Sequence, residues 1–335
     1  MKTLYCLTAG CVLLGNSLAH GQMLINGAGA TFPYPLYSKW FDEYAKVDHS
    51  VRFNYQSIGS GGGQKQILAQ TVDFGASDGP MSDENLAKAP GKLLHIPTVA
   101  GAVVLTYNLP GDLQLRLDGQ TIADIFLGKI TKWNDKRFLA LNPGAKLPDS
   151  DLVVVHRSDG SGTSYIFTDF LSSVSPVWEK QVGRNTSVKW PAGLGAKGNE
   201  GVAGQIKQLP GTLGYVELAY AHQNHLPVAE IKNAAGNFVA PTIDSVTAAL
   251  ASPKIPEDFR FSMVNPPGEK VYPIAGATWL LIYQEQKDAT KGKKLVEFLN
   301  WALTKGETMA QTLDYAPLPE SLEQRVIERI KTIKY

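Results

Sequence analysis

The sequence predicts an α/β protein built from two domains. The chain has 335 residues, and chains of this length usually fold into two domains, each with its own hydrophobic core. Because 44% of the residues are hydrophobic and only 19% are charged, folded domains are favoured over a disordered chain. Apolar segments of strand length alternate along the chain with segments of helical periodicity. Such alternation is typical of α/β proteins, so we expect mostly parallel sheets covered by helices.

The first third of the chain contains three segments with a clear pattern. An amphipathic helix is predicted after Pro33, with Thr31 near its N-cap. The apolar stripe of this helix is formed by Leu36, Tyr37, Trp40, Phe41 and Tyr44. Residues 51–56 predict a strand that leads through a glycine run into a short helix. Residues 93–108 are almost continuously apolar and β-branched, which is typical of a strand covered on both faces.

The remaining two thirds continue the same alternation. Residues 118–135 predict a helix followed by a turn with an exposed Trp133, and residues 151–155 predict a buried strand. A strand and then a helix are expected within residues 209–221, and another buried strand within residues 271–284. Two helices close the chain. The apolar stripe of the last helix is formed by Leu322, Val326, Ile330 and Ile333.

The first 21 residues have the layout of a secretory signal peptide. Lys2 precedes an apolar run over residues 3–14, and small residues follow it. The apolar run is shorter than the ~20 residues that span a bilayer. Cleavage after Ala19 or after Gly21 satisfies the small-residue rule equally well. Both cysteines of the chain lie in this segment, so we expect an exported protein without disulfides or thiol chemistry.

The charge balance restricts the partners of the mature chain. The formal net charge is +1, and without Lys2 the chain has 31 basic and 31 acidic residues. Nucleic acids and membrane surfaces select basic proteins, so neither is expected as a partner.

Three Gly/Ser/Thr-rich loops precede predicted helices, and they carry hydroxyl groups at Thr31, Ser60, Ser161 and Thr163. A helix N-terminus exposes unpaired N–H groups at the positive end of its dipole, and glycine lets an anion approach them. A single loop of this kind is more often ordinary turn chemistry. Three of them in one chain indicate a site for an oxyanion.

Two charged residues accompany the third loop. The Arg157 guanidinium offers a fixed fork of donors to a tetrahedral oxyanion. Arg157 could instead form an ordinary surface ion pair with Asp159, and both interpretations hold if Asp159 orients the guanidinium. Asp78, in the sequence "GASDGP", taken alone reads as a turn or helix-cap residue.

The sequence contains no motif that indicates a catalytic site or a metal site. Neither Ser60 nor Ser161 has the Gly-x-Ser-x-Gly surroundings of a nucleophile elbow. His222 and His225 are three residues apart, but no third ligand is near them in the sequence. Residues 193–201 resemble a nucleotide-binding loop only superficially and read as a structural turn. We therefore expect no catalytic residue, no metal and no cofactor.

Five segments resemble, in order, signature segments of the periplasmic phosphate-binding proteins of bacterial phosphate ABC transporters. They are residues 26–40, 58–82, 127–135, 157–171 and 197–221. The resemblance implies the α/β periplasmic binding-protein fold of type II, with two lobes, a hinge and a ligand cleft between the lobes. It implies that residues 24–107 and 274–335 form lobe I and that residues 108–273 form lobe II.

The resemblance also implies the ligands of the anion. The phosphate-binding residues would be Thr31, Phe32, Ser60, Asp78, Arg157, Ser161, Gly162 and Thr163. Asp159 would steady Arg157 without contacting phosphate, and Asp78 would accept a hydrogen bond from the protonated phosphate. Ser158 stands where close relatives often have alanine, but this position is not a ligand in the family motif.

The implied function is to bind inorganic phosphate in the periplasm and deliver it to the membrane permease of an import ABC transporter. Its partners would be the transmembrane permease subunits with their ATPase, and the protein itself would be a monomer. One alternative is a binding protein for another tetrahedral oxyanion, such as sulfate or molybdate. A secreted phosphatase is the other alternative, although it needs a nucleophile with a base, or a metal site.

Overall fold

A computed structural model describes residues 22–335 of the chain. The predicted signal peptide over residues 1–21, with both cysteines, lies outside the described residues. The strands are β1 (Met23–Gly29), β2 (Val51–Ser57), β3 (Phe74–Ser77), β4 (Leu93–Tyr107), β5 (Arg116–Leu117), β6 (Val153–Arg157), β7 (Leu194–Ala196), β8 (Thr212–Glu217), β9 (Glu230–Lys232), β10 (Phe238–Val239), β11 (Met263–Val264), β12 (Ile274–Tyr283) and β13 (Ala316–Pro317). The helices are α1 (Tyr34–Val47), α2 (Ser60–Leu68), α3 (Asp83–Leu86), α4 (Gly119–Phe126), α5 (Lys136–Leu141), α6 (Gly162–Val174), α7 (Pro176–Gln181), α8 (Gly198–Gln208), α9 (Leu218–Gln223), α10 (Ile243–Leu250), α11 (Ala289–Thr304), α12 (Glu307–Gln311) and α13 (Glu320–Ile330).

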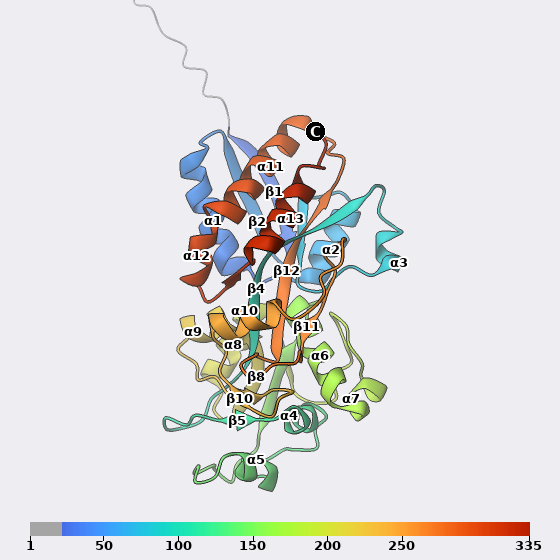
Figure 1. Cartoon of the computed structure of the whole chain (residues 1–335). Helices are drawn as coiled ribbons and strands as arrows, with labels where there is room; N and C mark the ends of the chain where they lie inside the picture. Colours follow the sequence, from blue (N-terminus) through green and yellow to red (C-terminus); the bar gives the residue numbers. More distant parts are fainter. Residues whose placement is uncertain (1–21) are drawn as a thin grey trace, which may run out of the picture.

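The main sheet runs continuously through both lobes of the molecule. Its strand order is β2-β1-β3-β12-β4-β8-β6-β7, and a small second sheet has the order β10-β9-β5. In Figure 1, α1, α11, α12 and α13 surround β1 and β2 in the upper lobe, whereas α4 to α8 lie in the lower lobe. The long strands β4 and β12 lie side by side and run from one lobe into the other.

The prediction of mostly parallel sheets is wrong for the centre of the main sheet. β1 is parallel to β2 and β3, and β6 is parallel to β7 and β8. However, β12 is antiparallel to β3 and β4, and β4 is antiparallel to β8. The chain crosses between the lobes along β4 and returns along β12, so these two strands point in opposite directions. All residues of both strands are buried, and a continuously buried, mostly apolar run does not reveal strand direction.

The helical patterns are confirmed at both ends of the described chain. The buried residues of α1 are Leu36, Tyr37, Trp40, Phe41 and Tyr44. Those of α13 are Leu322, Val326 and Ile330, and Ile333 is buried just beyond the helix. Each stripe faces the core of the first lobe because its members recur at the period of an α-helix.

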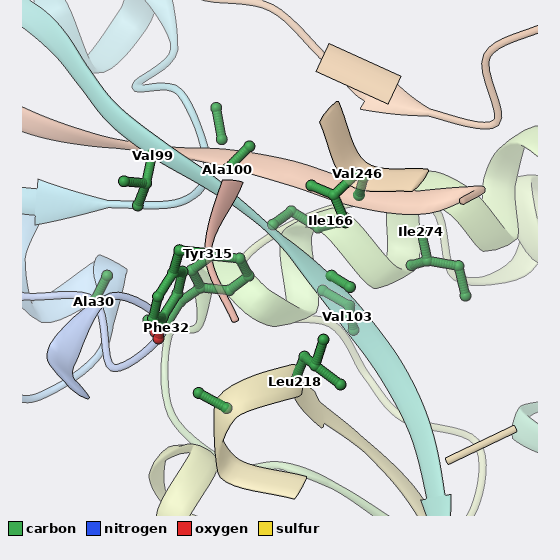
Figure 2. Packing of buried hydrophobic residues seen from close by; sticks show 14 of the residues in the cluster. Ala30, Phe32, Val99, Ala100, Val103, Ile166, Leu218, Val246, Ile274 and Tyr315 are labelled. Carbon is green, nitrogen blue, oxygen red and sulfur yellow. The ribbon is translucent and has the colours of Figure 1, made fainter. Parts of the chain in front are cut away.

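One hydrophobic cluster extends through both lobes. Figure 2 shows Phe32 and Tyr315 packed together on one side of β4, with Val103 further along this strand and Leu218 of α9 beside it. The ring centroids of Phe32 and Tyr315 are 6.2 Å apart. The loop after β1 is therefore anchored in the core close to the strands that connect the lobes.

The expectation of an exposed Trp133 is wrong. This residue is fully buried, its indole nitrogen Nε1 donates to the carbonyl oxygen of Gly211 at 3.0 Å, and its ring packs 5.3 Å from that of Phe138. The turn was expected to face solvent, but Phe138 of α5 and the backbone of Gly211 cover the indole in the folded chain. Within residues 22–335, no helix is both long and apolar enough to cross a membrane.

Candidate functional site

Four residues of the predicted site come from three loops at the carboxyl ends of β1, β2 and β3. Thr31 and Phe32 follow β1 and precede α1, Ser60 is the first residue of α2, and Asp78 directly follows β3. All four side chains are at most 2% exposed. Because β1 is parallel to β2 and β3, the ends of these strands meet at one edge of the sheet.

The other predicted residues come from the second lobe. Arg157 is the last residue of β6, and Ser161 is the N-cap of α6, where its hydroxyl accepts from the Ser164 N–H at 3.0 Å. Gly162 and Thr163 form the first turn of α6. The N–H groups of a first turn have no acceptor within the helix, so they are available to an anion.

Contacts between the two lobes bring these loops together. The backbone N–H of Gly61 donates to the carbonyl oxygen of Gly160 at 2.8 Å. Gly162 lies so close to Asp78 and Ser60 that a Cβ atom would come within 2.4 Å of both side chains. The first turn of α6 therefore faces the first turn of α2 and the Asp78 carboxyl group.

Arg157 is held by a two-point ion pair. Its Nε donates to Asp159 Oδ1 at 2.8 Å, and its Nη2 donates to Asp159 Oδ2 at 2.6 Å. Its Nη1 reaches Thr163 Oγ1 at 3.4 Å. Burial raises the pKa of Asp159, but the hydrogen bonds and charge of Arg157 outweigh burial and hold this pKa below its ordinary value. Asp159 is therefore ionised at neutral pH and orients the guanidinium.

The Asp78 side chain is almost completely buried. Its Oδ1 accepts from the Thr278 hydroxyl at 2.8 Å, and its Oδ2 lies 3.4 Å from the Ser60 hydroxyl. Burial raises the pKa of Asp78 to about 7, although the Thr278 hydrogen bond, the charge of Arg157 and Ser60 act to lower it. This carboxyl group is thus poised to exchange a proton near neutral pH.

The backbone carbonyls of Thr31 and Phe32 are already engaged. Tyr220 donates its hydroxyl to the Thr31 carbonyl at 2.6 Å, and Tyr315 donates to the Phe32 carbonyl at 2.6 Å. These contacts fix the peptide units of the loop after β1. Fixed donors need little reorganisation when they meet a ligand.

Sequence reasoning missed three buried polar residues around the site. Thr278 of β12 contacts Asp78. Asn199 of α8 contacts both Thr31 and Thr163. Glu217 is the last residue of β8, and its backbone N–H donates to the side chain of Asn199. Asn199 belongs to the loop that was interpreted as a structural turn. Thr278 lies 200 residues from Asp78, so only the pairing of β12 with β3 brings them together.

The site has the chemistry of an anion receptor. It combines hydroxyl groups, the first turns of α2, α6 and α8, and one oriented guanidinium, with Asp78 as an acceptor. Among residues 22–335, no three His, Cys, Asp or Glu side chains are grouped so that they could hold a metal. His222, considered earlier as a ligand, pairs instead with Asp314 at 2.8 Å.

Residues 16–305 match the family described as the PBP superfamily domain. The sequence is 46% identical over 312 residues to the phosphate-binding protein PstS of Pasteurella multocida, with 92% of this chain and 90% of the relative covered. It is 44% identical over 335 residues to PstS of Haemophilus influenzae, with 99% and 98% covered.

Solved structures share the fold. A high-affinity periplasmic phosphate-binding protein bound with phosphate superposes with a TM-score of 0.72 at 24% identity, covering 91% of this chain and 93% of that one. A phosphate-binding protein from Stenotrophomonas maltophilia gives 0.70 at 22% identity, covering 92% and 94%. The predicted class, an α/β periplasmic binding-protein fold with two lobes, is confirmed.

Proposed function

This chain belongs to the PBP superfamily and, within it, to the PstS phosphate-binding proteins, and from that premise we propose that it binds inorganic phosphate between its lobes for an import ABC transporter. The observation that carries the proposal is the buried Asp78 carboxyl group, which faces the first turn of α6 among hydrogen-bond donors.

Asp78 explains how such a site selects phosphate. Near neutral pH, inorganic phosphate keeps at least one proton, whereas sulfate keeps none. The Asp78 carboxylate accepts a hydrogen bond from the phosphate O–H, but it would face a bare negative oxygen of sulfate. An unmatched buried acceptor of this kind can discriminate by ~10⁴-fold.

The remaining groups replace the water that the anion loses on entry. The donors in this proposal are the hydroxyls of Thr31, Ser60, Ser161 and Thr163, the N–H groups of Phe32, Gly162 and Thr163, and the Arg157 guanidinium. Removing an ion from water is costly, so each anion oxygen requires such partners. Asp159 keeps the guanidinium in place through its two hydrogen bonds.

Phosphate capture involves closure of lobe II (residues 108–273) on lobe I (residues 24–107 and 274–335). In this proposal β4 and β12 form the hinge, because they are the long strands that run between the lobes. The closed lobes are then recognised by the transmembrane permease subunits, which work with their ATPase. The protein acts as a monomer, with no cofactor and no nucleic acid.

The proposed location is the periplasm, reached through a signal peptide cleaved within residues 1–21. Its support comes from the sequence of this segment and from the relatives of the chain. N-terminal sequencing of the exported protein tests it, and a retained Met1 would refute cleavage.

Calorimetric titration of the mature protein tests the function directly. At about pH 8, where Asp78 is mostly ionised, we expect phosphate to bind and excess sulfate not to compete. Equal binding of sulfate or molybdate would favour the alternative of another oxyanion receptor. A chromogenic phosphate ester should not be hydrolysed above background, and turnover would favour the phosphatase alternative.

A further inference from the structure

Asn199 connects the two lobes through a single buried side chain. It is the second residue of α8 and is fully buried. Its Nδ2 lies 2.7 Å from Thr31 Oγ1 in one lobe and 3.1 Å from Thr163 Oγ1 in the other. Its Oδ1 accepts from the backbone N–H of Glu217 at 2.9 Å.

The third contact determines which way the amide points. The Glu217 N–H can only donate, so the atom that faces it must be the amide oxygen. The amide nitrogen, with its two hydrogens, therefore faces Thr31 and Thr163, and it has one hydrogen for each threonine.

The hydroxyl of Thr31 is left with only a hydrogen to offer. A hydroxyl oxygen has two lone pairs and one hydrogen. Thr31 Oγ1 accepts from Asn199 Nδ2 at 2.7 Å and from the Asn199 backbone N–H at 3.2 Å. Both lone pairs are thus occupied, and the O–H can act only as a donor.

The same reasoning applies to Thr163. Its Oγ1 accepts from Asn199 Nδ2 at 3.1 Å and from Arg157 Nη1 at 3.4 Å. Its lone pairs are directed at these two donors, so its hydrogen is also left free for a ligand. One amide group therefore donates to two hydroxyls from opposite lobes and leaves the hydrogen of each hydroxyl free for the ligand.

We propose that Asn199 is a positioning residue that makes Thr31 and Thr163 obligatory donors to the bound anion. This inference rests on the proposed function, and it adds a residue that need not touch the anion itself. The hydroxyls of Thr31 and Thr163 thereby donate to the unprotonated oxygens of the anion, and Asp78 remains as the acceptor for the hydrogen of a protonated anion oxygen. Asn199 and Thr163 belong to the same lobe, so the contact with Thr31 is the one that closure brings about, and it couples closure to the correct orientation of the Thr31 donor.

Replacing Asn199 by aspartate keeps the shape and reverses the polarity. In Asn199→Asp, a carboxylate oxygen takes the place of Nδ2 and accepts the hydrogens of Thr31 and Thr163. These hydrogens then turn away from the anion, and the new charge repels it. We expect phosphate to bind about 100-fold more weakly or worse at about pH 8, since two hydrogen bonds to a charged ligand are lost and a like charge is added.

A pH profile separates positioning from a general structural effect. Protonation of the introduced carboxyl restores one hydrogen, so the affinity of Asn199→Asp relative to wild type should recover as the pH falls towards about 6. The ionisable groups around position 199 are Arg157 from β6, Asp159, which accepts from the Gly198 N–H, Glu217 from β8, Tyr220 from α9, and Glu200, the next residue of α8. They are present in both proteins, so the ratio of affinities isolates the substitution.

Asn233→Asp is the matched control. Asn233 is buried and donates through Nδ2 to the carbonyls of Gly268, Glu269 and Val271, outside the site. This control should lower the melting temperature and leave the dissociation constant for phosphate unchanged. Circular dichroism establishes that both variants fold.

Titrations with phosphate and with sulfate make every outcome decisive. If the wild type binds sulfate instead, the proposed function fails, but Asn199→Asp must still weaken sulfate because both anions need donors. If the wild type binds neither anion, both proposals are overturned. If Asn199→Asp binds the wild-type ligand within threefold at about pH 8, or loses affinity equally at every pH, the role of Asn199 is refuted.

Discussion

Gly162 packs directly against the carboxyl group of Asp78, although the two residues belong to different lobes. A Cβ atom at position 162 would come within 2.4 Å of Asp78 Oδ2 and equally close to Ser60 Oγ. Only glycine therefore lets the first turn of α6 approach the acceptor and the hydroxyl on the opposite side of the site. In the proposed closure, this contact limits how closely the two lobes can approach each other.

Gly162→Ala should weaken phosphate binding by about 100-fold or more. The added methyl group would push α6 away from Asp78 and Ser60, and misplaced donors lose most of their electrostatic effect. Gly204→Ala is the control, because Gly204 lies within α8 and a Cβ atom there meets nothing within 4 Å. Calorimetry should show an unchanged dissociation constant for the control, and an equally unchanged value for Gly162→Ala would contradict the steric argument.

Asp78→Asn should lose selectivity more than affinity. The amide keeps the size of the side chain but can donate to a bare oxygen, so sulfate is no longer repelled. We expect the preference for phosphate over sulfate to fall by about 100-fold or more, with a smaller change in phosphate affinity. Asp73→Asn is the control, since Asp73 pairs with Lys291 at 3.0 Å outside the site. Unchanged selectivity in Asp78→Asn would defeat the proposed mechanism.

Sulfate should bind wild type better at acid pH. The pKa of Asp78 is raised to about 7, mainly by burial, so below that pH the carboxyl group is protonated and can donate to sulfate. By linkage, sulfate affinity should rise roughly tenfold between about pH 8 and about pH 6. Asp78→Asn cannot titrate at this position, so its sulfate affinity should vary much less. A flat profile for the wild type in the same titrations would rule out this linkage.

Arg157→Lys should weaken phosphate binding by about tenfold or more. The single ammonium nitrogen of a lysine cannot reproduce the planar fork in which two nitrogens bind both oxygens of Asp159 and a third remains for the ligand. Arg137→Lys is the matched control, because Arg137 pairs through two nitrogens with Asp135 next to α5, in the part of the lower lobe farthest from the upper one. Titration of both variants with phosphate decides the matter, and equal affinities would show that the fork geometry of Arg157 is unimportant.

Glu217 is predicted to be protonated in the folded protein. Its Oε1 is buried without a hydrogen-bond partner, and its Oε2 lies 3.0 Å from the Tyr315 hydroxyl. That hydroxyl has a single hydrogen, which it donates to the Phe32 carbonyl at 2.6 Å. One hydrogen cannot satisfy both acceptors fully, and a protonated carboxyl group would supply the hydrogen for the contact between Glu217 Oε2 and the Tyr315 oxygen. Burial, together with the charges of Asp314 and Asp78, raises the pKa of Glu217 well above its ordinary value and outweighs the contacts with Tyr315 and the Ala219 N–H, which act to lower it.

Glu217→Gln should make stability less dependent on pH. The folded-state pKa of Glu217 lies above its unfolded value, so its contribution is complete below the unfolded pKa and is lost as the pH rises through the folded pKa. Urea unfolding at a series of pH values should therefore show the wild type losing more unfolding free energy than Glu217→Gln as the pH rises from about 4. Glu285→Gln, at an exposed side chain, should follow the wild type. Parallel curves for all three proteins would show that Glu217 is ionised when folded.

Local patterns were sufficient for many of the elements. The stripe of α1 and the apolar runs of β4 and β12 are properties of neighbouring residues, so period and length reveal them. Strand direction and the burial of Trp133 depend on distant segments, and here the interpretation from sequence was wrong. Asn199 was missed because a buried amide and a solvent-facing one look alike in a sequence.

The sequence by itself determined the α/β class, the helices with a clear stripe and, through its resemblance to a family, the residues proposed to bind the anion. Only the tertiary structure decided that Asn199 polarises two threonines, that Thr278 holds Asp78, and that Gly162 must lack a side chain. The physical reason is that periodicity and turn chemistry act between neighbours, whereas hydrogen-bond direction, desolvation and close packing depend on atoms that meet only after folding.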